Sequence, residues 1–296
     1  MSVVELTSLQ RPNDRLWRRR AVNRSMEILA WLAGAIAVAI LGIVVWSVAK
    51  RGAGELNWAL LTKTPVSFAI GNEPQGLANA FVGSLVIVGL ATLMALPVGI
   101  LVAIYVNEFA PRAIRNGVGL ALDVLNGIPA IVVGIFVYGL LVVGRGPSGF
   151  AGSFALAVLM LPLVARATIE VLALVPDSLR EASLGLGVPR WRTTLGIVLP
   201  AALGGILTGT ILAVARAAGE TAPLLFTSSI FANSVQTDVT KALPNIPVLI
   251  FTYSEQPDPA LHQQAWAAAL VLMAFVLLAS LGAKALLVRS RRKLAP

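Results

Sequence analysis

Residues 176–200 read PDSLREASLGLGVPRWRTTLGIVLP and connect two long apolar runs. Pro176 should end the helix that precedes it, because proline cannot continue a helical hydrogen-bond ladder. Asp177 or Ser178 can cap a new helix, and Glu181 lies near its first turn. The segment therefore predicts a short helix at the membrane surface, outside the apolar runs.

The second half of this connection limits the length of that helix. Gly187 and Pro189 are residues at which helices commonly end, so the helix should have about two turns. Ala182 and Ser183 lie in its middle, and their small side chains would let another protein approach closely. The connection is therefore expected to hold a short helix that another protein can approach closely.

Apolar runs of membrane-spanning length lie on both sides of this segment. A bilayer core about 30 Å thick requires about 20 apolar residues at a rise of about 1.5 Å each. Six runs are near that length: 28–49, 79–106, 118–143, 152–175, 197–218 and 265–288. The predicted fold class is therefore an all-α integral membrane protein with about six transmembrane helices.

Composition supports this prediction and excludes several functions. The 296 residues are 57% hydrophobic and 12% charged, against roughly 25% charged residues in soluble domains. The chain contains no cysteine and one histidine, His262, so a thiolate site or a histidine metal cluster is not expected. The net charge of +9 comes from basic residues near the ends of the apolar runs, which indicates lipid contact and not nucleic acid.

The distribution of lysine and arginine predicts the orientation. Placing the N-terminus inside puts 16 of these residues in cytoplasmic connections and five in outer ones. Both termini are therefore predicted to be cytoplasmic. Residues 1–26 should form a basic tail, flexible or lying on the surface, and 289–296 a second basic tail. Residues 27–78 should hold the first span and an outer loop, and the outer segment 219–264 can hold half-helices or a gating loop.

Prolines and charges within the predicted spans suggest a moving, polar interior. Pro97, Pro129 and Pro162 should each kink a span, since each removes a backbone donor. Two arginines have a glutamate four residues later, in the pairs Arg166 with Glu170 and Arg216 with Glu220. Each pair can neutralise itself on one helix face, or the arginines can face a transport path and bind a tetrahedral oxyanion. Asp123 is assigned no role.

The 176–200 segment resembles a motif of the inner-membrane subunits of binding-protein-dependent ABC importers. That motif has the form E-A-A, three residues, G, nine residues, I-x-L-P, and this chain has Glu181-Ala182-Ser183, Gly187 and Ile197-Val198-Leu199-Pro200 at the same spacing. Ser183 for the second alanine is the one departure. The resemblance implies a type I importer permease (MetI-like) fold over 79–288, with a cytoplasmic coupling helix within 177–200.

Two further segments are similar to the PstA-type phosphate permeases. These are residues 213–227, AVARAAGETAPLLFT, and residues 126–134, NGIPAIVVG. The resemblance implies that Arg166, Arg216 and Glu220 line the substrate path. It gives Glu181, Ala182, Ser183 and Gly187 the role of contacting the ATPase, and leaves Glu170 as a local partner of Arg166.

The resemblance also implies the composition of the complete transporter in the bacterial inner membrane. The expected partners are two ATP-binding subunits, a second permease that is a homologous sibling, an external phosphate-binding protein, inorganic phosphate and membrane lipid. No lysine follows a glycine, so a phosphate-binding loop is absent from the sequence. We therefore expect no cofactor, metal or catalytic residue in this chain, with ATP and Mg²⁺ used by the partners.

Three alternatives remain open at this point. The cargo can be another tetrahedral oxyanion, such as sulfate, molybdate or tungstate, because the same arginines would bind it. The chain can be an intramembrane lipid-modifying enzyme, although a cluster of catalytic groups is not evident in the sequence. It can also be a purely structural membrane subunit.

Overall fold

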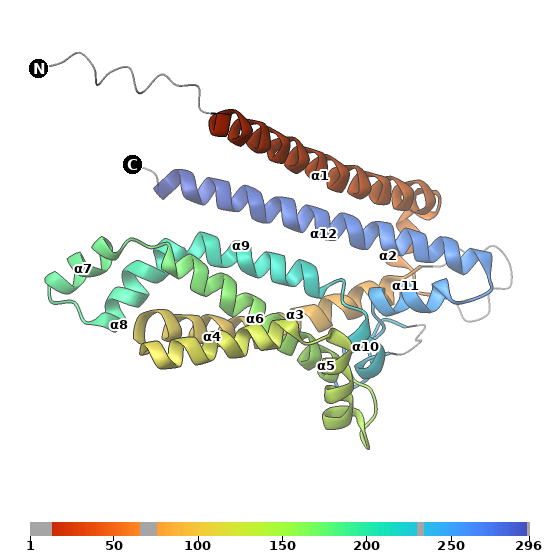
Figure 1. Cartoon of the computed structure of the whole chain (residues 1–296). Coiled ribbons are helices and arrows are strands. Elements are labelled where there is room, and N and C mark those ends of the chain that lie inside the picture. The colour runs from red at the N-terminus through yellow and green to blue at the C-terminus, as the bar shows by residue number, and fades with distance from the viewer. Residues whose placement is uncertain (1–13, 66–75, 230–233, 295–296) are drawn as a thin grey trace, which may run out of the picture. The chain divides into compact units, whose positions relative to one another are not determined.

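The computed structural model describes residues 14–65, 76–229 and 234–294, in which all regular structure is helical. The chain forms two compact units, residues 1–50 and residues 51–296. Figure 1 shows the helices of both units.

The first unit consists of helix α1, Asp14–Gly52, whose last two residues enter the second unit. Its 39 residues contain the predicted span 28–49 and extend it at both ends. The helix begins inside the basic segment 1–26, so residues 14–26 of the predicted tail are helical. Arginine and leucine are good helix formers in water, and a helix can therefore continue beyond the bilayer. Residues 1–13 lie outside the described residues.

The second unit contains four long helices and a set of short ones. The long helices are α3 (Ala78–Ile104), α6 (Gly149–Ala173), α9 (Leu199–Ala217) and α12 (Pro259–Leu294). The shorter α-helices are α2 (Trp58–Thr62), α4 (Arg112–Gly127), α5 (Ala130–Val137), α7 (Asp177–Gly185), α8 (Arg190–Thr193), α10 (Ala222–Thr227) and α11 (Ile246–Ser254). A 3₁₀ turn, η2 (Ala53–Glu55), and three π-helical turns, η3 (Tyr105–Phe109), η4 (Tyr138–Val142) and η5 (Thr194–Val198), complete the unit.

Helix α6 packs between α3 and α9 through small residues. On α3 the buried stripe recurs at every fourth position: Gly83, Ile87, Ala91, Ala95, Gly99 and Ala103. A Cβ atom on Gly99 would lie 2.9 Å from Val164 Cγ1 of α6, and one on Gly205 of α9 would lie 2.5 Å from Val171 Cγ1 of α6. Helices in lipid associate by such close packing, so glycine and alanine determine both contacts.

The third predicted span, 118–143, is broken into two helices. Helices α4 and α5 meet at an angle of 93°. Ile128 and Pro129 between them both have extended backbone, because a proline disfavours helical geometry at the residue before it. The predicted distortion at Pro129 is thus a complete break, whereas α3 and α6 continue through Pro97 and Pro162.

The count of membrane spans agrees with the prediction. Five helices are long and apolar enough to cross a membrane: those over 16–55, 78–109, 149–173, 190–217 and 259–285. Counting the bent pair α4–α5 as one span makes six.

Two short helices, α10 and α11, lie within the segment 219–264, for which half-helices and a gating loop were both open. Helix α11 is tied to α3 where the Ile246 backbone N–H donates to Ser84 Oγ at 2.8 Å. The Ser228 hydroxyl, at the end of α10, bonds both the N–H and the C=O of Leu243 at 3.1 Å. Helices α10 and α11 lie at one end of the second unit, and α7 and α8 lie at the opposite end (Figure 1). We call the latter the α7 end.

Gly83 provides a test of the packing of α3. A Cβ atom there would collide with the backbone carbonyl oxygen of Pro244, whereas Gly89 on the same helix has no such neighbour within 4 Å. We expect Gly83→Ala to destabilise the protein by about 1–3 kcal/mol through overpacking. Gly89→Ala should be neutral or stabilising by up to about 1 kcal/mol, because alanine favours helix. Thermal unfolding midpoints in detergent measure both, and equal midpoints would contradict the packing described.

Candidate functional site

The predicted surface helix is present as α7, Asp177–Gly185. The chain turns at Gly187, which has a φ of +78°, before α8 begins. The helix start differs from the prediction, because Pro176 occupies the N-cap position and no side chain caps the first turn. Asp177 instead accepts a hydrogen bond from Arg180 at 3.0 Å.

The residues of the predicted docking motif point in different directions. Glu181 and Ala182 are exposed, and so is Leu186, at 84%. Ser183 is buried, and its hydroxyl lies 2.9 Å from that of Thr193 in α8. The expectation that Ser183 faces a partner was therefore wrong: the hydroxyl that replaces the motif's second alanine finds its hydrogen bond inside the chain.

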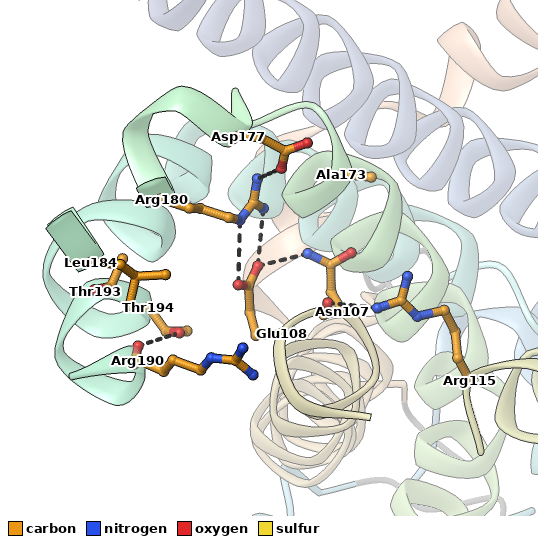
Figure 2. Close-up of a pocket in the computed structure, with 10 residues that line it drawn as sticks. All are labelled: Asn107, Glu108, Arg115, Ala173, Asp177, Arg180, Leu184, Arg190, Thr193 and Thr194. Carbon is orange, nitrogen blue, oxygen red and sulfur yellow. Dashed lines mark hydrogen bonds and ion pairs between the residues drawn. The ribbon is translucent and has the colours of Figure 1, made fainter. Parts of the chain in front are cut away.

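Arg180 joins α7 to two other helices (Figure 2). Its Nη2 lies 3.0 Å from Glu108 Oε1 and its Nε donates to Glu108 Oε2 at 3.4 Å. The guanidinium also donates to the backbone carbonyls of Val175 at 2.6 Å and Leu172 at 2.9 Å. The side chains of Arg180 and Glu108 are 17% and 11% exposed, so this ion pair is largely removed from solvent.

A polar cavity of about 420 Å³ adjoins this ion pair. Arg190 and Thr194 line it from α8 and η5, and Asn107 lines it from η3 (Figure 2). Asn107 Nδ2 donates to Glu108 Oε1 at 2.7 Å, and Arg115 of α4 donates to the Asn107 carbonyl at 3.0 Å. The α7 end is thus held together by directional polar contacts around an open space.

A second group of polar side chains lies at the break between α4 and α5. Arg216 and Glu220, at the end of α9, line a cavity of about 50 Å³ together with Asn126 of α4. Arg216 Nε lies 3.8 Å from Glu220 Oε1, which confirms the predicted pair. The Arg216 side chain is 66% exposed and that of Glu220 is 25% exposed, so the arginine is the more accessible member of the pair.

Arg166 has a different partner from the one predicted. Its Nη2 lies 2.5 Å from Asp123 Oδ2 and donates to the Gly119 carbonyl at 2.6 Å, both on α4. Glu170 is exposed, and no contact between it and Arg166 is found in the described part of the chain. The assignment of Glu170 as local partner was therefore wrong: the break between α4 and α5 leaves α4 beside α6, which brings Asp123 within reach of Arg166.

Arg166 lies on the same face of α6 as two leucines that line the cavity beside Arg216. Leu159 and Leu163 line the cavity that contains Arg216, and Arg166 follows Leu163 by three residues on the same helix face. This spacing corresponds to a rise of about 4.5 Å. Arg166 therefore lies about one turn from the cavity, on the side toward the α7 end, without lining it.

Sequence reasoning missed Glu108 and left Asp123 without a role. Glu108 lies two residues beyond the predicted second span, among basic connections, and Asp123 is the only carboxylate within 118–143. An isolated acid near several arginines was an available signal, but the pairing depends on helix contacts. In the described ranges, three or more His, Cys, Asp or Glu side chains do not gather as a metal site would require.

Comparisons with known proteins identify the family. A family model described as "Binding-protein-dependent transport system inner membrane component" matches residues 95–293. The phosphate transport system permease protein PstA of Yersinia pestis is 39% identical over 285 residues, covering 95% of each chain. PstA 1 of Mycobacterium tuberculosis (strain H37Rv) is 36% identical over 289 residues, covering 94% of this chain and 92% of the relative.

Solved structures share the fold at low sequence identity. The inward-facing MetNI methionine ABC transporter superposes with a TM-score of 0.60 at 17% identity, over 72% of this chain and 95% of that one. A bacterial ABC transporter that imports the polysaccharide alginate gives a TM-score of 0.56 at 18% identity, over 94% of this chain and 99% of that one. The chain therefore belongs to the binding-protein-dependent transport system inner-membrane components, and within them to the PstA-type phosphate transport permeases.

Proposed function

We propose that this chain is the membrane-spanning permease subunit of an ATP-driven importer of inorganic phosphate. The observation that carries the proposal is the Arg216–Glu220 pair beside the cavity at the α4–α5 break, in a chain whose relatives are phosphate permeases. A guanidinium matches the oxygens of a tetrahedral oxyanion and stays charged at any physiological pH. Irregular backbone within a membrane domain is tolerated where it lines a cavity, as residues 128–129 do here.

Arg166 extends this path toward the α7 end. Its Nε atom is buried and has no hydrogen-bond partner in the described residues. A buried donor normally has a hydrogen-bond acceptor, and a passing oxyanion can supply one here. Asp123 and Glu220 keep the arginines paired when phosphate is absent, which limits how tightly the path retains an anion.

The α7 end is proposed to face the cytoplasm, with both termini on that side. The excess of basic residues in the connections on this side supports the orientation. Leu179, Leu184 and Leu186 of the α7 region are exposed and can enter a groove of an ATP-binding subunit. The complete transporter would contain two such subunits, a sibling permease and an external phosphate-binding protein, with ATP and Mg²⁺ bound by the partner subunits.

Transport by the complete complex tests the cargo. Vesicles that contain the permease pair, the ATP-binding subunits and the binding protein should accumulate labelled phosphate when ATP is present. Excess sulfate should reduce this accumulation by less than about twofold. Uptake of sulfate, molybdate or tungstate without phosphate would contradict the proposed cargo and favour the other oxyanion.

The two arginines of the path can be tested separately from the fold. Arg166→Gln and Arg216→Gln should each lower phosphate uptake by at least about tenfold, because a hydrogen bond to a charged group contributes about 1.5–3 kcal/mol. Glu170→Gln is the matched control, since Glu170 is an exposed acid one turn from Arg166 on the same helix. It should leave uptake unchanged. Wild-type uptake in an arginine variant, at a normal protein level, would remove that arginine from the path.

The turn after α7 provides a test of ATPase docking. Alanine at Gly187 would have to adopt the left-handed backbone, which costs roughly 1–2 kcal/mol. Gly187→Ala should therefore reduce co-purification of the ATP-binding subunit by about five- to thirtyfold. Gly185→Ala is the control, because a Cβ atom there meets no atom within 4 Å. Equal retention of the ATP-binding subunit by both variants would contradict docking through α7.

A further inference from the structure

We infer that the Arg180–Glu108 ion pair is the link through which α7 moves α3. Arg180 and Glu108 are positioning residues in this inference, since neither contacts the cargo. The inference rests on the proposed docking of an ATP-binding subunit on α7. It adds a route by which that subunit reaches a helix that does not adjoin α7 in the chain.

The contacts of Arg180 make it a junction of three elements. Its guanidinium donates to Asp177 in the first turn of α7 and to the carbonyl of Leu172 at the end of α6. Two of its nitrogen atoms face the two carboxylate oxygens of Glu108 in η3, 72 residues away along the chain. A fork of this kind fixes direction as well as distance, so rotation or translation of α7 must carry Glu108 along or break both contacts.

Burial makes this ion pair costly to break. The two side chains are 17% and 11% exposed, unlike the Arg180–Asp177 contact, in which Asp177 is 88% exposed. Removing one member of a buried pair leaves an uncompensated charge, and the remaining partner then favours a different position. The contact is therefore expected to persist while α7 moves.

The other connections of α7 in the described part of the chain lead to α6 and α8, and not directly to α3. The chain itself joins α7 to α6 through 174–176 and to α8 through 186–189. The Ser183–Thr193 hydrogen bond adds a second tie to α8, which leads through η5 into α9. The Arg180–Glu108 pair is the side-chain contact that the structure describes between α7 and the end of α3.

The surroundings of the ion pair leave room for movement. The cavity of about 420 Å³ is lined by residues of α7, α8 and η3, so these elements border an open space beside the ion pair. Two of the elements that line this cavity are π-helical turns, η3 after α3 and η5 before α9. Such turns are rare and frequently occur at functional sites. Figure 2 shows Glu108 between Arg180 and Asn107 at this place.

Coupling of ATP hydrolysis to import tests the inference in the complete complex. Glu108→Ala and Arg180→Ala should retain the ATP-binding subunits and hydrolyse ATP within about twofold of the wild-type rate. Phosphate import should fall about tenfold, so the ATP consumed per imported phosphate rises about tenfold. The double variant should be no worse than either single variant, because the two residues act as one unit. Arg112→Ala, at an exposed arginine of α4, is the control and should keep the wild-type ratio.

A second measurement does not depend on the cargo. The chain has no cysteine, so spin labels can be attached at Leu101→Cys in α3 and Leu203→Cys in α9, both of which are exposed. The distance between these labels should change when Mg·ATP is added to the complete complex. The same addition should leave it unchanged when Glu108→Ala is also present.

Several outcomes would overturn the inference. The first is a wild-type ratio of ATP hydrolysed to phosphate imported in Glu108→Ala. The second is a label distance that still responds to Mg·ATP in that variant. The third is a label distance that does not respond to Mg·ATP in the wild type. Loss of the ATP-binding subunits from Glu108→Ala would show that the pair only supports the fold of α7. A label response that requires Glu108, in vesicles that import no phosphate, would instead support the link and contradict the proposed cargo.

Discussion

The close packing of α6 against α3 and α9 is the contact on which the rest of the second unit depends. Lipid is as apolar as leucine, so these helices are held by the fit of small residues, not by exclusion of water. Gly99 and Gly205 allow that fit on the two sides of α6. Helix α6 also carries Arg166 and ends at Ala173, four residues before α7 begins. One well-packed helix therefore positions both the polar side chains at the α4–α5 break and those at the α7 end.

The charged residues of the membrane domain depend on the break in the third span. A charged residue within a span costs at least about 2.5 kcal/mol on insertion scales, so it needs a partner or a polar cavity. The break at Pro129 supplies both, because it leaves α4 beside α6 and opens a cavity beside Arg216. Asp123 consequently pairs with Arg166, while Glu220 remains beside Arg216.

The α7 end is built on a different principle from the bundle. Packed apolar residues such as Ala103, Leu172 and Val198 join α3, α6 and η5 just inside this end. Beyond them, α7 is held by the polar contacts of Arg180 and Ser183 next to a cavity. Directional contacts of this kind transmit a displacement and can be re-formed, whereas interdigitated packing resists movement. A tightly packed bundle whose end is held by polar contacts suits a subunit that receives motion from a partner at that end.

The sequence by itself determined the features that depend on neighbouring residues. Apolar run length predicted six spans, and the spacing from Glu181 to Pro200 predicted the short helix α7 and the family. The Arg216–Glu220 pair followed from helical periodicity. Only the tertiary structure decided that Arg166 pairs with Asp123 instead of Glu170, that Ser183 points inward, and that Glu108 meets Arg180 from 72 residues away. The physical reason is that local rules fix where a side chain lies on its own helix, whereas its partner depends on which helices pack beside it.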